Sequence, residues 1–227
     1  TMQGQISYNN TFGDHTIGAT MVAERLKSQR TRNWIHASPV SNNLPLIYFP
    51  TADTYQDSDD KQARVGYIVR LNYNYANRYY LELSGRRDAS YLFAPGYRVG
   101  YFPGGSVGWR ITEEPFFRNL LHNNKNILSD LKLRASYGIL GDDNPNGSPI
   151  VAPYAYLPGY NYNQGTAIID GNALTVSRDK GIPTTNITWL KSRITDLGLD
   201  FVLLKGKLTG SIDYFYRKRT GLPASKN

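Results

Sequence analysis

Apolar and polar residues alternate one by one along about eight segments of this chain. A β-strand sends successive side chains to opposite faces, so each such segment predicts a strand with one apolar and one polar face. In the most regular segment, Val65, Tyr67, Val69 and Leu71 share one face, and Arg64, Arg70 and Asn72 share the other. The predicted strands span residues 5–12, 15–27, 64–75, 78–87, 99–111, 131–140, 186–204 and 207–219.

The connections between these segments alternate between short and long. Three are two-residue turns, at Gly13-Asp14, Ala76-Asn77 and Lys205-Gly206, and two are long polar loops over 28–60 and 141–185. Because the short turns occupy alternate positions in the chain, they must lie at one end of the sheet and the long loops at the other. This arrangement predicts an all-β, antiparallel transmembrane β-barrel with short periplasmic turns and long extracellular loops.

One connection, over 112–130, is long where the alternation calls for a short turn. It reads as a helical insert that starts at Thr112-Glu113-Glu114-Pro115. The apolar side of this insert is formed by Phe116, Phe117, Leu120 and Leu121. Glu113 and Glu114 are interpreted as acids at the helix N-terminus, which the helix dipole favours. A glycosidase would instead need two carboxyl groups flanking a cleft.

Composition adds a second indication of a barrel. Tyrosine accounts for 18 of 227 residues, and no apolar run reaches the roughly 18 residues that a membrane helix needs. Surplus tyrosine suits the aromatic girdles of a barrel, although it also occurs in β-sandwiches and sugar-binding surfaces. Cysteine is absent, which excludes disulfides and thiolate metal sites. The chain opens almost directly on a strand without a signal peptide, so we expect a mature or truncated form.

The net charge of +8 raises the alternative of a nucleic-acid-binding protein. The cations are not clustered, however, and many share the polar strand faces with carboxylates. We therefore predict a mixed-charge barrel lumen and no nucleic-acid partner. The predicted lumen-facing residues are Arg64, Arg70, Glu82, Arg86, Arg134, Asp200 and Asp213. The few charges on the apolar faces, such as Arg25, Arg87 and Lys218, fall at the strand ends nearest the long loops.

No pattern of catalytic or cofactor-binding residues emerges. The three histidines (His15, His36 and His122) share no metal-ligand spacing, and we predict no enzyme activity, no metal and no cofactor. The stretch from Gly141 to Gly147 resembles the start of a calcium-binding loop, but Pro153 occupies the position of the expected bidentate acid. A turn rich in Asp, Asn and Gly is the better interpretation, and calcium binding near Asp142 stays open.

Four tyrosines in the longest loop are candidate substrate-binding residues: Tyr154, Tyr156, Tyr160 and Tyr162. Aromatic rings beside polar groups can stack on a sugar or a peptide. The same rings could equally pack against a partner protein or hold the loop together.

Several motifs carry a resemblance to a known family. They are YYLELSGRRD at 79–88, FAPG at 93–96, YFPGGSVGWRITEEPFF at 101–117, LKLRASYG at 131–138 with GDDN at 141–144, LGLDF at 197–201 and LTGSIDYFY at 208–216. In this order and spacing they resemble the barrel of SusC/RagA-type TonB-dependent transporters, which are nutrient importers of the Bacteroidetes outer membrane. The resemblance covers most of residues 61–220 apart from the loop at 145–185.

The resemblance implies that residues 1–227 form part of a 22-stranded barrel domain, without the plug domain and the TonB-interacting segment of the family. It also implies a SusD-like surface lipoprotein, TonB and outer-membrane lipid as partners, and an oligosaccharide or a peptide as substrate. Two alternatives stay open. One is a complete eight-stranded barrel with an adhesive or structural role. The other is a soluble glycan-binding β-sandwich, in which the apolar strand faces would pack on each other.

Overall fold

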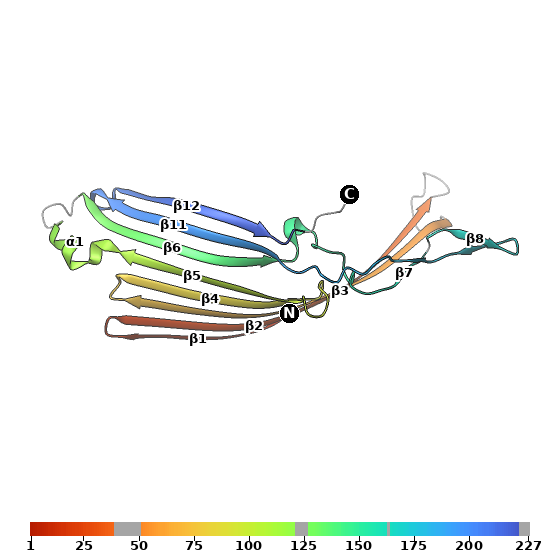
Figure 1. Cartoon of the computed structure of the whole chain (residues 1–227), viewed down its shortest axis with the longest axis horizontal. Coiled ribbons are helices and arrows are strands. Elements are labelled where there is room, and N and C mark those ends of the chain that lie inside the picture. Colours follow the sequence, from red (N-terminus) through yellow and green to blue (C-terminus); the bar gives the residue numbers. More distant parts are fainter. Residues whose placement is uncertain (39–50, 121–126, 163, 223–227) are drawn as a thin grey trace.

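Eight long strands form one antiparallel sheet in the computed structural model, which describes residues 1–38, 51–120, 127–162 and 164–222 (Figure 1). The strands are β1 (Met2–Phe12), β2 (His15–Ser38), β3 (Thr51–Tyr75), β4 (Tyr79–Ser90), β5 (Val99–Arg110), β6 (Leu128–Asp142), β11 (Leu190–Leu203) and β12 (Leu208–Thr220). They lie side by side in chain order. This meander confirms the all-β antiparallel fold predicted from the alternation.

The short turns lie at one end of the sheet together with the helical insert between β5 and β6, and the other connections between the long strands lie at the opposite end (Figure 1). In the turn between β3 and β4, Ala76 and Asn77 have φ angles of 51° and 55°, and the Arg78 amide donates to the Tyr75 carbonyl at 2.9 Å. Two successive left-handed residues match the twist of a hairpin, so the turn fixes the register of both strands. The turn at Lys205 adopts a short 3-10 helix, η3 (Leu204–Gly206).

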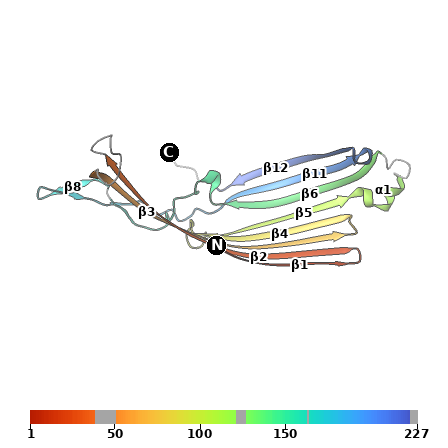
Figure 2. The ribbon, with the colours of Figure 1, turned by 180° about the vertical axis from the view of Figure 1, so that it is seen from behind.

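The sheet is a single layer, and the view from behind shows no second sheet over it (Figure 2). Its apolar face is exposed along the strands; Leu83 and Leu197 are 48% and 52% exposed, for example. In the described residues nothing covers this face as the partner sheet of a soluble sandwich would. β1 and β12 form opposite edges with no pairing between them in the described part of the chain, which favours a section of a larger barrel over a small closed one.

The sequence predicts a long loop over 28–60, and this prediction is wrong for most of that stretch. β2 and β3 stay paired beyond Lys27 and Lys61 as far as the Ser38–Thr51 pair, and they project from the sheet as a long hairpin (Figure 1). The alternation that predicts strands depends on one face being apolar. In this projection apolar residues no longer recur at every second position, so the pattern disappears although the backbone ladder continues.

The long connection predicted over 141–185 is present but contains short elements. They are η2 (Pro145–Gly147), β7 (Tyr160–Asn161), β8 (Thr166–Ile169), β9 (Asn172–Thr175) and β10 (Arg178–Asp179). β7 pairs with β10, and β8 pairs with β9. The next long strand, β11, begins at Leu190, four residues later than the Asn186 start that the sequence predicts.

The helical insert between β5 and β6 is confirmed in a shorter form. It consists of the 3-10 helix η1 (Ile111–Glu113) and the helix α1 (Pro115–Leu120); Leu121 lies outside the described residues. Among the described residues, no helix has the length and apolar character to cross a membrane.

Candidate functional site

The polar face of the sheet carries a network of ion pairs between neighbouring strands. At its centre, Arg134 on β6 makes a bidentate contact with Asp200 on β11, with Nε–Oδ2 and Nη2–Oδ1 distances of 2.7 and 2.9 Å. The same Nη2 donates to Asp213 Oδ1 on β12 at 2.9 Å. One guanidinium therefore joins three adjacent strands, in the fork geometry that suits Arg and carboxylate pairs.

Glycines beneath these side chains make the network flat. A Cβ at Gly198 would lie 2.5 Å from Asp213 Oδ1 and 2.8 Å from Arg134 Cζ. A Cβ at Gly66 would similarly lie 2.8 Å from a carboxylate oxygen of Glu24 and of Asp88. Because glycine has no side chain, the long side chains of the neighbouring strands can lie directly over the sheet.

The other predicted lumen-facing residues are paired on the same face. Arg86 contacts Glu24 on β2 and Asp88 on its own strand. The remaining pairs join Arg70 Nε to Glu82 Oε1 at 3.5 Å, and Arg64 Nη2 to Asp143 Oδ1 at 2.8 Å. All seven residues thus lie on one face and take part in ion pairs. The sequence predicts the shared face, whereas the choice of partners depends on the register between strands.

A small apolar cluster at the long-loop end was not predicted from the sequence. Leu92, Phe93, Phe102 and Trp189 are buried together, and the Trp189 indole donates to the Arg98 carbonyl at 2.9 Å. The sequence places Phe102 among polar-face residues, where a large apolar side chain is unexpected. The feature of the sequence that could have indicated this packing is the pair of glycines beside Phe102, because a Cβ at either Gly100 or Gly141 would overlap the Phe102 ring. The cluster ties the loop at 91–98 to the segment that precedes β11.

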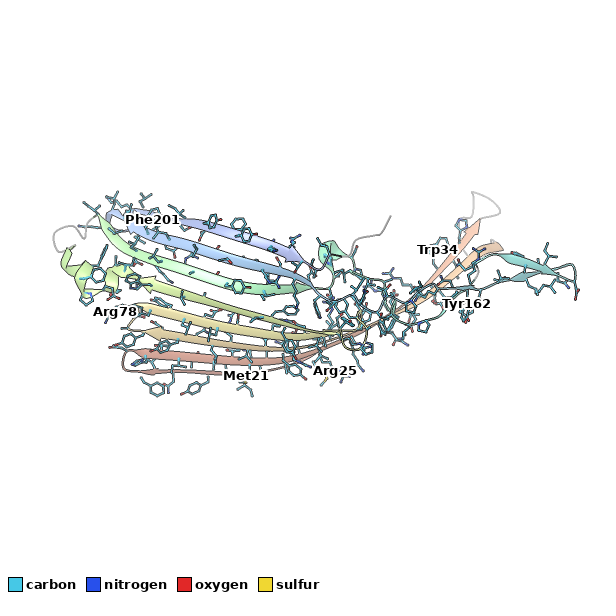
Figure 3. The ribbon with its side chains drawn as sticks, viewed as in Figure 1. Met21, Arg25, Trp34, Arg78, Tyr162 and Phe201 are labelled. Atoms are coloured by element: carbon cyan, nitrogen blue, oxygen red, sulfur yellow. The ribbon has the colours of Figure 1, made fainter. Side chains whose placement is uncertain are left out.

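The four loop tyrosines divide into two pairs. Tyr154 donates to the Lys61 carbonyl at 3.2 Å and packs edge-on against Tyr91, and Arg98 donates to the Tyr156 hydroxyl at 2.9 Å. These two rings hold the loop together. Tyr160 and Tyr162 are 69% and 81% exposed, and Figure 3 shows Tyr162 in the projecting part of the molecule. Of the four tyrosines, the second pair exposes the most surface for contact with a ligand.

At the short-turn end, Glu114 anchors the helical insert to the sheet. It is 7% exposed, accepts hydrogen bonds from the Tyr79 hydroxyl and from Trp109 Nε1, and lies 3.6 Å from Arg78 Nη1. These partners, the Tyr79 hydroxyl first, lower the pKa of the Glu114 carboxyl. Glu114 directly precedes α1, and the first turn of α1 contains no acid, so its role is a tether across strands more than a helix cap.

The apolar face has aromatic residues at two levels. Tyr67 and Tyr101 lie toward the long loops, and Tyr75, Tyr79 and Trp109 lie in one row at the short-turn end. Tyr67 and Tyr75 are eight residues apart on β3, or about 27 Å along the strand at ~3.4 Å per residue. With the tilt of barrel strands, this spacing is comparable to the apolar band of about 25 Å between two aromatic girdles.

The aspartates at the start of the long loop form a turn. Asp142 Oδ1 accepts a hydrogen bond from the Asn144 amide at 2.9 Å, as in an Asx-turn. In the part of the chain that the structure describes, no three His, Cys, Asp or Glu side chains are grouped to hold a metal ion.

Comparison with known proteins identifies relatives of one kind. No family model matches the chain. It is 39% identical over 160 residues to the TonB-dependent receptor SusC of Bacteroides thetaiotaomicron, covering 70% of this chain and 15% of SusC. It is 28% identical over 227 residues to the TonB-dependent receptor P3 of Formosa agariphila, covering 97% of this chain and 21% of that receptor. The chain therefore spans about a fifth or less of the length of these relatives.

The fold has a close match among solved structures. A chain of the RagAB peptide transporter superposes with a TM-score of 0.76 at 19% identity, over 96% of this chain and 23% of that one. A chain of the RagAB peptide importer in its open-open state gives the same TM-score. These proteins are outer-membrane β-barrel transporters and not enzymes. The chain belongs to the SusC/RagA family of TonB-dependent outer-membrane transporters, and it forms a section of the barrel wall.

Proposed function

We propose that the complete protein containing this chain imports an oligosaccharide or a peptide across the outer membrane, with energy from TonB and a SusD-like lipoprotein over the long-loop end. The observation that carries the proposal is the two-faced sheet: one face is apolar and exposed, and the other holds a paired, mixed-charge network. This sheet occurs in a chain 39% identical to SusC over 160 residues.

In this mechanism the barrel section is a passive wall. Its apolar face meets lipid, where an unpaired sheet edge would leave backbone groups without hydrogen bonds, so the wall must close with strands from elsewhere in the protein. Its polar face borders the lumen. There, Arg64, Arg70, Glu82, Arg86, Arg134, Asp200 and Asp213 hold the plug and line the path of the substrate. Because their charges are already paired within the wall, the path has a nearly neutral, hydrogen-bonding surface.

The exposed Tyr160 and Tyr162 are proposed as ligand contacts in the extracellular loop. Their aromatic rings offer flat faces to a sugar ring or a peptide side chain, whereas Tyr154 and Tyr156 already have partners within the protein.

The test uses a strain in which the full-length gene is deleted and then restored as wild type or as a variant. We expect deletion to abolish uptake of at least one labelled oligosaccharide or peptide in a defined panel. The import proposal fails if every compound enters the deletion strain at the wild-type rate.

The same strain tests the tyrosines. Tyr160→Ala with Tyr162→Ala should reduce uptake severalfold at low substrate concentration, because stacking contacts are lost. The matched Tyr→Phe pair keeps the rings and should retain most uptake. Replacing the exposed Ile182 by Ala is a loop control. Wild-type uptake by the double Ala variant would refute the tyrosine assignment without affecting the import proposal.

A further inference from the structure

Between the level of Lys27 and the short-turn end, six cations lie on the apolar face of the sheet, all near its long-loop end. They are Arg25 and Lys27 on β2, Arg87 on β4, Lys191 and Arg193 on β11, and Lys218 on β12. Figure 3 shows Arg25 where the sheet meets the loops, with Met21 nearer the middle of the sheet. From the level of Arg25 to the short-turn end, this face carries no Asp or Glu on the described strands.

These cations differ from those on the polar face in their partners. The polar-face arginines contact carboxylates, as Arg134 does with Asp200 and Asp213. Arg87 instead lies over the Tyr67 ring at 5.8 Å, and Arg193 Nη1 donates to Thr220 Oγ1 at 3.4 Å. In the described part of the chain none of the six forms an ion pair with a carboxylate, so they present an uncompensated positive charge to the outside.

The position of the cations along the strands shifts from one strand to the next, as it should if all of them lie at one depth in a membrane that tilted strands cross. Register places Arg25 on the second strand opposite Val65, and Arg87 on the fourth strand opposite Tyr67. Arg193 on the seventh strand lies opposite Ile139 and Lys218. The residue next to Arg193, Ile194, lies opposite Gly138, and the register continues from there through Gly104 and Ser84 to Arg70, which adjoins Val69. From β2 to β11 the position of the cations thus moves steadily toward the short-turn end, as expected for barrel strands tilted by about 35–45°.

Tyrosines lie just below the cations on the same face. Tyr67 is two residues from Val65, which lies opposite Arg25, and Tyr216 is two residues from Lys218. Tyrosine prefers the depth of lipid headgroups, and long cationic side chains extend from the membrane edge toward the aqueous side. The six cations therefore lie at the depth of the headgroups of the outer leaflet.

We propose that this cationic belt, defined by Arg25, Lys27, Arg87, Lys191, Arg193 and Lys218, binds the phosphate groups of outer-leaflet glycolipids. Arg and Lys are good phosphate ligands, and no acid lies on this face from the level of Arg25 to the short-turn end, so an anionic headgroup there meets no repulsion. The proposal rests on the orientation of the barrel in the membrane and is independent of the imported substrate.

The test measures lipid binding to the full-length protein in detergent by native mass spectrometry. The probes are lipid A and the same lipid A with its phosphates removed enzymatically. The belt variant combines Arg25→Gln, Arg87→Gln and Arg193→Gln. The matched control removes three cations from the opposite face or the projecting hairpin: Arg30→Gln, Arg217→Gln and Arg219→Gln.

We expect the wild type and the control to prefer phosphorylated lipid A, and the belt variant to bind it roughly a hundredfold more weakly, since each cation near an anionic surface contributes about fivefold. Binding of dephosphorylated lipid A should be the same for all three proteins. Equal affinity of the wild type for the two lipids, or equal losses in the belt and control variants, would overturn the proposal.

Two further arms keep the result interpretable. Arg87→Gln alone should weaken lipid A binding about fivefold, whereas Arg87→Lys should stay near wild type; this pair serves if the triple variant does not fold. Millimolar inorganic phosphate should not displace lipid A. Displacement at equal concentration would show a site for free phosphate and overturn the assignment to lipid.

Discussion

Adding one methyl group under the Arg134 network tests whether glycine is needed there for ion pairing. Gly198 and Gly138 lie on the polar faces of adjacent strands, and neither has a positive φ. A Cβ at Gly198 would meet Asp213 Oδ1 at 2.5 Å and Arg134 Cζ at 2.8 Å, whereas at Gly138 the nearest atom, Gly104 Cα, is 4.0 Å away. Gly198→Ala and Gly138→Ala are therefore the same change in the same kind of strand, with and without an obstacle.

The magnitudes follow from what must move. At Gly138 the added methyl has room, and Ala in a strand interior should stabilise the protein by about 0.5–1 kcal/mol through the unfolded chain. At Gly198 the obstructing atoms are side-chain ends, so they swing away and lose hydrogen bonds. Arg134, Asp200 and Asp213 are each more than a third exposed, so each lost charged contact costs only about 1 kcal/mol. Loss of two contacts outweighs the backbone gain, and the two variants should differ by about 2 kcal/mol.

The assay is the urea midpoint of the full-length protein in detergent micelles, followed by tryptophan fluorescence. A second comparison places Gly198→Ala in an Arg134→Met background, where the ion pairs that the added methyl group would break are already absent and Asp213 can turn away without losing a partner. Most of the penalty should disappear there. Equal midpoints for the two glycine variants, or an unchanged Gly198→Ala penalty in the Arg134→Met background, would refute the argument that glycine is selected here for ion pairing.

Three other variants test separate parts of the molecule. Leu83→Arg puts a cation on the outward face midway between the aromatic levels, which should cost about 2–4 kcal/mol and block insertion into bilayers, while Ser84→Arg on the inward face should insert normally; a liposome insertion assay distinguishes them. The pKa of Glu114 is lowered in the folded protein, so its contribution to stability is present above its unfolded pKa and is lost as pH falls through the folded value. Glu114→Gln should therefore lower the thermal midpoint at pH 7 and converge with wild type in acid; a gap that is constant from pH 7 to pH 3 would contradict the tether. Trp189→Ala removes the largest side chain of the loop cluster, at a local cost of about 3–5 kcal/mol, and should speed hydrogen exchange in residues 91–98 but not in β4; unchanged exchange would show that the loop is held by other contacts.

The projecting hairpin shows where strands can no longer be predicted from the alternation of apolar and polar residues. From Val65 to Tyr75 the alternation predicts both the strand and its faces, because lipid on one side forces apolar residues to every second position. Beyond Lys61 both faces of the hairpin meet water, so neither face has to be apolar and the alternation no longer reveals a strand. The backbone pairing of β2 and β3 nevertheless continues to Ser38 and Thr51. The same reasoning explains the late start of β11, since residues 186–189 are held by the loop cluster instead of a neighbouring strand.

By itself, the sequence determined the strands that cross the membrane, the residues on each face, the turns that join them and the family. These features are local, because each depends on a period of two residues or on a short motif. Only the tertiary structure decided the partners of each side chain. Arg134 meets Asp200 from 66 positions away, Phe102 fills the space left by two glycines, and Glu114 receives hydrogen bonds from two strands. Register and loop packing set such contacts, and neither leaves a periodic trace in the chain.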